Sequence, residues 1–311
     1  MIHFVRNILN KCGQALVSPH SMSKVEYEAV KLLQAKQIID FRRNFPPQNL
    51  REAEFTIFSQ WGEDGIIQWI ISLIPDIIHI FIEFGVQDYR ESNTRFLLMN
   101  DNWKGFIIDS DSDNIKAIKQ SEYYWKYDLT AECAFVDRDN INDLFAQNGF
   151  NGDIGILSID IDGNDYWVWE AISVVSPQIV ICEYNSLWGN EKSLAVAYDP
   201  FFFRTKAHYS NLYWGASIKA LTSLAASKGY SLLGSNSAGS NLFFVKSTYA
   251  QFFDIPSPKE AYVESKFREA RGINGELMYK SGKERHSFVR DLPLVDLETG
   301  KISPISDIFQ C

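Results

Sequence analysis

Short apolar runs that alternate with helix-length segments occupy the middle of this chain, and they restrict the folds open to it. The runs are, in order, IIHIFIEFG, KGFIIDSD, ECAFVD, IGILSIDID and QIVICEYN. The segments between them, such as 91–101 and 165–173, carry apolar residues at helical spacing. Continuous apolar strands separated by helices are typical of βαβ units, whose parallel sheet is covered by helices on both faces.

The flanking sequence adds further elements to this α/β pattern. Apolar residues at helical spacing predict helices over 24–45, over 63–74 and over 217–228. Two more strands, YSLLGSN and NLFFVKS, are separated only by a turn rich in Ser, Gly and Asn. Strands this close in sequence favour an antiparallel hairpin, which we place at the edge of the parallel sheet.

The chain divides into a helical extension (1–54), a main domain (55–253) and a polar C-terminal tail (254–311). Within the main domain, residues 185–216 carry many aromatic side chains without a clear period. This insert is too long for a plain connection and too aromatic for a disordered one, so we interpret it as the wall of a substrate pocket. We expect the tail to pack on the domain or on a partner.

Charge and composition exclude several classes of protein. The formal net charge is −9 and no Lys/Arg-rich run is present, which argues against a nucleic-acid partner. Polar residues and a proline interrupt the apolar stretch 66–84, so we predict no membrane span. The four cysteines show no metal-ligand spacing, and residues 1–17 lack the apolar core of a signal peptide. We therefore expect a cytoplasmic protein, either a monomer or a homo-oligomer.

Acidic residues close the predicted parallel strands. They are Glu83, Asp109, Asp137, Asp160 and Glu183. Ligands of open parallel sheets bind beyond the carboxyl ends of the strands. One acid at a strand end is common on a solvated surface, whereas an acid at every one of these ends indicates a shared site.

The first of these strand ends argues against a dinucleotide. The segment EFGVQD has one glycine and not the G-x-G-x-x-G pattern that wraps a pyrophosphate. A single glycine beside an acid suits a ligand with an adenosine and a charged amino-acid tail but no phosphate. Asp109, which follows Glu83 by about 26 residues, is where an acid that binds ribose hydroxyls is expected. The alternative role for Asp109 is the N-cap of the next helix.

Five segments together resemble the FkbM-like group of class I S-adenosylmethionine-dependent methyltransferases. They are FSQWGEDGII, FIEFGVQDYRESNTRFLL, WKGFIIDSD, LSIDIDGNDYWVWEAI and VICEYN, and the resemblance extends over roughly residues 55–250. It implies a Rossmann-like, seven-stranded, mostly parallel sheet over 55–253, with S-adenosylmethionine bound over the first two strands. It further implies O-methylation of a sugar hydroxyl or of a small precursor of a surface glycan or natural product.

The resemblance also implies roles for single residues. Glu83 and Gly85 fall in the first donor-binding motif, Asp109 on the ribose, and Asp160 at the fourth strand end, facing the methyl group. We assign three further residues to the donor site: Gln60, Asn93 and Ser110. The first motif departs from the usual pattern, because Gln87 and Asp88 stand where a second small residue is common.

The segment SQWGED allows two interpretations. In the first, Ser59 caps a helix and Asp64 is favoured by the helix dipole. In the second, the start of this helix leans over the carboxylate end of the methyl donor.

The segment IDIDGNDYW carries three acids, and methylation of a hydroxyl needs a base or a cation that lowers the pKa of the hydroxyl. Asp160 and Asp162 share a face if the strand persists that far, and we predict that both are catalytic. Asn164 or Asp165 is placed to cap the next helix. Asp160 and Glu183 offer the oxygen ligands that Mg²⁺ or Mn²⁺ prefers, so we predict them as metal ligands.

The insert supplies an alternative base. His208 has an ordinary pKa suited to proton abstraction, although a single loop histidine is more often only exposed. The neighbouring aromatic and amide side chains suit the face of a sugar ring; they are Tyr209, Asn211, Tyr213 and Trp214. Arg204 and Lys206 suit an acidic acceptor, such as a phosphorylated sugar.

Two other functions stay open on the sequence alone. The first is a metal-dependent hydrolase or phosphoryl-transfer enzyme that uses Asp160, Asp162 and Glu183. The second is a non-catalytic methyltransferase-like subunit whose 254–311 tail faces a partner. A methyltransferase binds the methyl donor, whereas the hydrolase should not bind it and the non-catalytic subunit should bind it weakly or not at all.

Overall fold

The computed structural model describes residues 24–266 and 269–310, which belong to two compact units, Met1–Pro46 and Pro47–Cys311. In the first unit, helix α2 (Lys24–Asn44) confirms the helix predicted over 24–45. It ends just before Pro46 and Pro47, because proline lacks the amide hydrogen that a helix needs. The interpretation of residues 1–17, and Cys12 and Cys311, lie outside the described residues.

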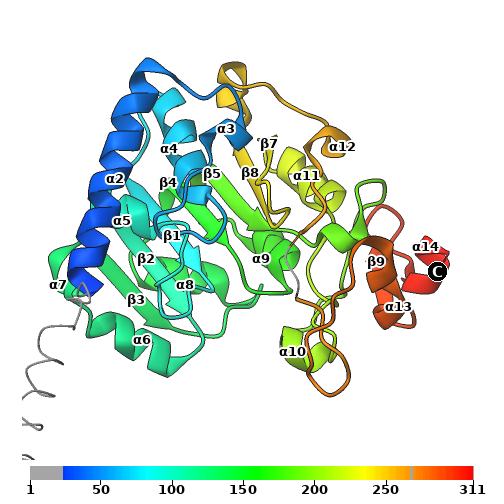
Figure 1. Cartoon of the computed structure of the whole chain (residues 1–311). Helices are drawn as coiled ribbons and strands as arrows, with labels where there is room; N and C mark the ends of the chain where they lie inside the picture. The colour runs from blue at the N-terminus through cyan, green and yellow to red at the C-terminus, as the bar shows by residue number, and fades with distance from the viewer. Residues whose placement is uncertain (1–23, 267–268, 311) are drawn as a thin grey trace, which may run out of the picture. The chain divides into compact units, whose positions relative to one another are not determined.

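The second unit contains a mixed sheet of seven strands (Figure 1), in the order β3-β2-β1-β4-β5-β8-β7. The strands are β1 (Ile80–Phe84), β2 (Lys104–Asp109), β3 (Leu129–Cys133), β4 (Gly152–Ile159), β5 (Val175–Glu183), β7 (Tyr230–Ser235) and β8 (Asn241–Lys246). Strands β1 to β5 pair in parallel, whereas β8 is antiparallel to both β5 and β7. The predicted seven-stranded, mostly parallel sheet with a C-terminal hairpin at its edge is confirmed.

Helices cover both faces of this sheet, because side chains of both faces are apolar. On β1, Ile82 and Phe84 join the core of one face, and Phe81 joins that of the other. The first face packs against α8 (Ile141–Gln147), α9 (Asp165–Ala171) and α11 (Ile218–Ser227). The second packs against α4 (Glu63–Leu73), α5 (Arg95–Asp101), α6 (Ser112–Lys119) and α7 (Glu122–Lys126). A parallel sheet is stabilised by the burial of apolar side chains on both of its faces.

The third strand does not lie where the sequence predicted it. The segment ECAFVD suggested residues 132–137, but β3 begins at Leu129 and ends at Cys133. Leu129 and Ala131 are buried and pair with β2, which fixes the register. Asp137 is therefore not a strand-end acid. Its carboxylate accepts hydrogen bonds from the backbone nitrogens of Asp139 and Asn140, both 2.8 Å long, in the turn before α8.

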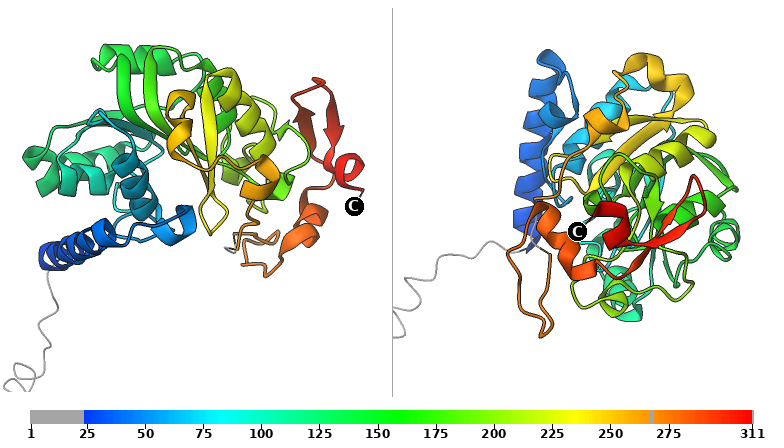
Figure 2. Two further views of the ribbon diagram at one scale, coloured as in Figure 1. Left: turned by 90° about the horizontal axis from the view of Figure 1, so that it is seen from above. Right: turned by 90° about the vertical axis from the view of Figure 1, so that its right-hand side faces the viewer.

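A second, smaller sheet joins the insert to the C-terminal segment. Its order is β10-β9-β6, with β6 (Leu194–Ala195), β9 (Pro293–Asp296) and β10 (Ile302–Pro304). Apolar residues of the two segments share one core, including Trp188, Leu294 and Ile305. Figure 2 shows these C-terminal elements at one end of the unit, away from β2 and β3. The domain boundaries proposed from the sequence stay predictions.

The remaining elements are short. They are α3 (Leu50–Ala53), α10 (Arg204–Ala207), α12 (Pro258–Ala261), α13 (His286–Val289), α14 (Ile305–Phe309) and the 3₁₀ turns Ser186–Trp188, Ser247–Phe252 and Gly282–Arg285. Among the described residues, no helix is long and apolar enough to cross a membrane. Cys133 and Cys182 are free thiols.

Candidate functional site

Two cavities open at the carboxyl edge of the sheet. They lie where the strand order reverses, between the adjacent strands β1 and β4. The larger, of about 510 Å³, is lined by the loops after β1, β2, β3 and β4 and by the insert. The smaller, of about 330 Å³, is lined by the start of α4 and the loop after β1. Gly85, Gln87 and Asp160 line both, so the two cavities adjoin there. Such a switch point is where open α/β sheets bind ligands.

The predicted site residues divide between these cavities. Gly85, Asp109, Ser110, Asp160 and Asp162 line the larger one. The smaller one is lined by Gln60, Glu83 and Asn93, together with Gly85 and Asp160. The structure therefore brings every predicted donor-site residue to this edge of the sheet.

Gly85 lets the turns after β1 and β4 approach each other. Its φ is +82°, in the left-handed region that favours glycine. Its backbone nitrogen donates to the carbonyl oxygen of Ile108 at 3.0 Å, which ties it to β2. A Cβ on Gly85 would lie 1.5 Å from the carbonyl oxygen of Asp160. No other residue type fits this position without moving the backbone.

Asp109 joins the turns after β1 and β2. It is buried, and its Oδ2 accepts a hydrogen bond from the backbone nitrogen of Gln87 at 2.7 Å. Its Oδ1 accepts from the backbone nitrogen of Asp111 at 2.9 Å and from Asn114 Nδ2 at 3.2 Å. The N-cap of α6 is Asp111, which bonds the nitrogen of Asp113, so the capping role considered for Asp109 is wrong.

Glu83 organises the loop after β1. Its carboxylate accepts hydrogen bonds from Ser92 Oγ and Thr94 Oγ1, each 2.5 Å long, and from the backbone nitrogens of Asn93 and Thr94. Burial raises the pKa of Glu83, and these hydrogen bonds oppose the shift. Asn93 Nδ2 in turn donates to Ser158 Oγ on β4 at 3.1 Å. Glu83 thus lines the smaller cavity and fixes the loop residues that line it.

The segment before α4 lies beside the smaller cavity, but Ser59 does not cap the helix. The N-cap is Gly62, which makes no side-chain bond. Ser59 instead exchanges hydrogen bonds with Asp64, whose carboxylate also accepts from the backbone nitrogens of Ile57, Phe58 and Ser59. Burial raises the pKa of Asp64 to about 6. Gln60, before the helix, and Glu63, its first residue, line the cavity, and their position over the carboxylate end of the donor stays a prediction.

Three carboxylates gather where β4 and β5 end. Asp160, Asp165 and Glu183 each present an oxygen within 4.8 Å of the others. Burial and then the neighbouring acids raise the pKa values of Asp160 and Glu183 well above their ordinary range. Glu183 is buried, and its Oε2 has no hydrogen-bond partner in the described part of the chain. Crowded carboxylates of this kind favour a bound proton or a cation.

The strand does not persist to Asp162, which was the condition for Asp160 and Asp162 to share a face. Strand β4 ends at Ile159, and Asp162 has a left-handed φ of +56°. Asp162 Oδ1 accepts from Arg204 Nη1, and the charge of Asp162 also contributes to the raised pKa values of Asp160 and Glu183. Asp165 accepts hydrogen bonds from the backbone nitrogens of Ile161 and Gly163, both 2.9 Å long, and so closes the turn. Asn164 is the N-cap of α9, without a side-chain bond to the helix.

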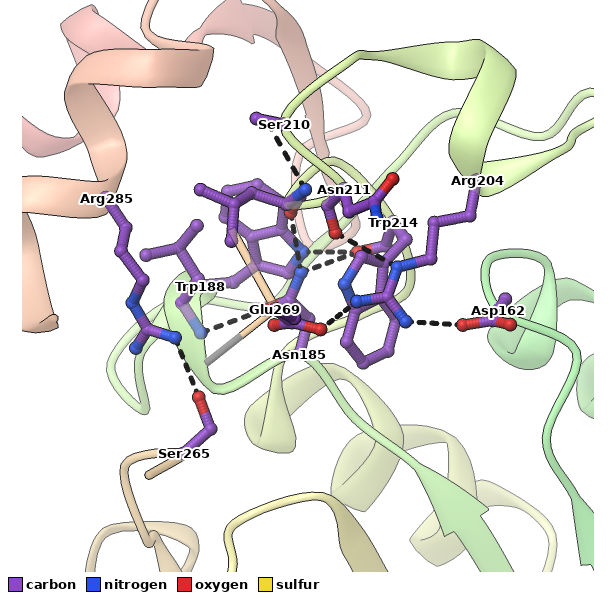
Figure 3. Close-up of polar contacts among 12 residues, drawn as sticks. Asp162, Asn185, Trp188, Arg204, Ser210, Asn211, Trp214, Ser265, Glu269 and Arg285 are labelled. Atoms are coloured by element: carbon purple, nitrogen blue, oxygen red, sulfur yellow. Dashed lines mark hydrogen bonds and ion pairs between the residues drawn. The ribbon is translucent and has the colours of Figure 1, made fainter. Parts of the chain in front are cut away.

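Arg204 links three segments where the insert lines the larger cavity (Figure 3). Its Nη1 lies 2.5 Å from Asp162 Oδ1, and its Nη2 pairs with Glu269. Its Nε donates to the carbonyl oxygen of Asn211 at 3.0 Å, and its guanidinium stacks over the Trp214 ring at 4.5 Å. These contacts hold Arg204 in the lining of the larger cavity, and its binding of an acidic acceptor stays a prediction.

The other residues predicted from the insert lie elsewhere. His208 Nδ1 hydrogen-bonds Ser210 Oγ at 2.8 Å, and burial lowers the pKa of His208. His208 is not among the residues that line either cavity. Of the four residues predicted to face a sugar ring, Asn211 lines the larger cavity, whereas the Tyr213 hydroxyl donates to Pro293 O and Trp214 lies against Arg204. Lys206 Nζ lies 4.9 Å from the Phe203 ring centroid.

The lining of the larger cavity includes residues that sequence reasoning did not single out, among them Phe135, Phe202, Phe203 and Arg271. The phenylalanine run at 201–203 was visible as part of an aromatic insert, but nothing in it distinguished the two that face the cavity. Arg271 stands in a polar, turn-rich tail, and no pattern around it signalled a site.

Comparison with known proteins gives fold-level similarity only. No family model and no curated protein matches the chain. A putative O-methyltransferase from Klebsiella pneumoniae aligns at 10% identity and a TM-score of 0.41, over 77% of this chain and 96% of that one. An O-methyltransferase from Bacillus cereus in complex with S-adenosylhomocysteine aligns at 11% identity and 0.39, over 79% and 100%. Similarities this weak transfer no activity to this chain.

Proposed function

We propose that this protein is an S-adenosylmethionine-dependent O-methyltransferase that acts on a sugar hydroxyl or on a small precursor of a surface glycan or natural product. The observation that carries the proposal is the pair of cavities that adjoin at Gly85 and Asp160, with Asp109 in the wall of the larger. The adenosine lies in the larger cavity, with its ribose hydroxyls donating to Asp109. The amino-acid end of the donor lies in the smaller one.

The linings of the two cavities suit these two ends of the donor. Ile108, Ala134, Phe135 and Val136 give the larger cavity an apolar wall for the adenine ring. The smaller cavity is lined by five acids and one arginine: Glu63, Glu83, Asp88, Glu91, Asp160 and Arg90. The donor carries a sulfonium and an ammonium group, which an acidic lining attracts, and a carboxylate, for which Arg90 is the cationic residue of this lining. The sequence resemblance to methyltransferases supports the same assignment.

Methyl transfer requires that the acceptor oxygen attack the methyl carbon while the carbon–sulfur bond breaks and its electron pair returns to sulfur. The acceptor hydroxyl loses its proton in this reaction, and a base must take it. Asp160 borders both cavities, and we assign it this role. Asp162, held by Arg204, positions the turn that carries Asp160. His208 lines neither cavity, so we do not assign it a role in proton transfer.

The acid cluster also fits a divalent cation. Asp160 and the unpartnered Oε2 of Glu183 are oxygen ligands of the kind that Mg²⁺ and Mn²⁺ prefer. Asp165 presents the third oxygen of the cluster, and each of its oxygens also accepts one backbone hydrogen bond. A bound cation would lower the pKa of an acceptor hydroxyl. The same cluster supports the second candidate function, a metal-dependent hydrolase or phosphoryl-transfer enzyme.

Calorimetric titration with S-adenosylhomocysteine distinguishes these candidates. We expect micromolar binding to the wild type, lost in Asp109→Ala and retained in Asp113→Ala, an exposed acid of α6. Folded protein that does not bind the probe would refute the methyltransferase proposal. A parallel titration with MnCl₂, using Glu183→Gln as the variant, tests the cation site independently of activity.

A further inference from the structure

Two arginines line the larger cavity, and their surroundings differ. Arg204 pairs with Asp162 and Glu269, donates to Asn211 O and stacks on Trp214. Two carboxylates face its single charge, and each of its three nitrogens donates to a protein atom (Figure 3). Arg204 is therefore held in place by contacts within the protein.

Arg271 is the arginine with unused hydrogen-bonding capacity. Its Nη1 is buried and has no hydrogen-bond partner in the described part of the chain. No ion pair of Arg271 occurs among the described residues either, whereas Arg204 has two. A guanidinium nitrogen that is removed from water without a partner costs free energy, and an acceptor atom on a ligand removes that cost.

The backbone of Arg271 is fixed at the acceptor side of the cavity. Its nitrogen donates to the carbonyl oxygen of Ser210 at 3.1 Å, next to Asn211, which also lines the cavity. Arg271 forms a β-bridge with Leu277, and Gly272 N donates to Glu276 O at 2.8 Å. These backbone contacts fix where the Arg271 side chain begins, so a ligand has to order the side chain but not the turn that carries it.

The acids of this cavity have partners other than Arg271. Asp162 and Glu269 pair with Arg204, and Asp109 accepts hydrogen bonds from the turns around it. A guanidinium presents parallel N–H groups that match the two oxygens of a carboxylate or phosphate.

We infer that the acceptor is an anionic sugar, and that Arg271 binds its carboxylate or phosphate group. This inference rests on the proposed methyltransferase function and adds the charge of the acceptor to it. Arg271 then orients the acceptor between its own position and Asp160, so that the hydroxyl to be methylated points at the donor.

The test is calorimetric titration of the full-length protein saturated with S-adenosylhomocysteine. The titrants are glucuronate for the carboxylate arm, glucose 6-phosphate for the phosphate arm, and glucose as the neutral control. The variants are Arg271→Gln, Arg271→Lys and Arg290→Gln; Arg290 is an exposed arginine outside both cavities. Thermal unfolding and S-adenosylhomocysteine affinity verify that each variant is folded.

We expect one of the anionic sugars to bind at least about tenfold more tightly than glucose. Arg271→Gln removes this preference, Arg271→Lys retains part of it, and Arg290→Gln leaves it unchanged. Anionic sugars that bind no better than glucose would overturn this inference, and so would a preference that survives in Arg271→Gln. Neither result would contradict the proposed methyltransferase function. Failure of the wild type to bind S-adenosylhomocysteine would overturn the proposed function and this inference together.

Discussion

The α-carbon of Gly85 faces the carbonyl oxygen of Asp160 so closely that a Cβ there would lie 1.5 Å from that oxygen. This contact joins the first and fourth strand ends, and both proposed donor subsites meet at it. Glycine is necessary here because two backbones approach each other closely, and not because of any side-chain chemistry.

Gly85→Ala should therefore destabilise the fold beyond the cost of its positive φ. Gly149→Ala is the matched control, because Gly149 has a φ of +80° and no atom within 4 Å of an added Cβ. We expect a loss of about 1–2 kcal/mol for Gly149→Ala and about 2–5 kcal/mol for Gly85→Ala in urea unfolding. Equal losses would contradict the close contact.

Arg204 and Glu269 should be strongly coupled, because both side chains are 15% exposed and the pair is mostly removed from water. Arg204→Met leaves Glu269 buried without its partner and should cost about 3 kcal/mol. The double variant Arg204→Met/Glu269→Leu should cost at least about 1 kcal/mol less than the sum of the two single variants.

The control for this double-mutant cycle is the exposed pair Lys126–Glu122 on α7. Its coupling energy should stay below about 0.5 kcal/mol. Additive effects at Arg204 and Glu269 would show that this ion pair does not hold the insert to the C-terminal segment.

Glu83→Gln should loosen the loop at Ser92–Thr94, because a neutral amide accepts these four hydrogen bonds less strongly. We expect a loss of about 2 kcal/mol in unfolding free energy and faster amide hydrogen exchange at Asn93 and Thr94. Glu91→Gln, at an exposed acid of the same loop, should change stability by less than about 0.5 kcal/mol. Unchanged exchange at both amides would contradict the role given to Glu83.

Asp64 should make stability fall as pH rises. Burial raises its pKa to about 6, above the ordinary range that holds in the unfolded chain. The folded state thus binds the proton more tightly, so the stabilisation is complete below about pH 4 and is lost as pH rises through 6. The free-energy difference between wild type and Asp64→Asn should change by about 3 kcal/mol over this window. A difference independent of pH would contradict the burial argument.

The strands that carry the site could be predicted from the sequence, because apolar side chains on both faces leave a clear signal. Asp109 and Gly85 were found for the same reason, since Asp109 ends such a strand and Gly85 directly follows one. The third strand was placed three residues late. Its register depends on buried Leu129 and Ala131, whereas the more apolar-looking AFV segment lies beyond the sheet.

The acceptor side could not be predicted in the same way, because its contacts join segments far apart in sequence. Arg204 meets Glu269 across 65 residues, and Arg271 reaches the cavity from a tail without hydrophobic period. The left-handed conformation of Asp162, just after β4, was likewise required by no local pattern.

A crystal structure of the complex with S-adenosylhomocysteine tests the central proposal most directly. We predict that the ribose hydroxyls lie within hydrogen-bond distance of the Asp109 carboxylate, at about 2.5–3.0 Å. The sulfur should lie beside Gly85 and Asp160, with the amino-acid end in the cavity lined by Glu83 and Asn93. A ligand bound elsewhere, or a ribose remote from Asp109, would contradict the proposed donor site.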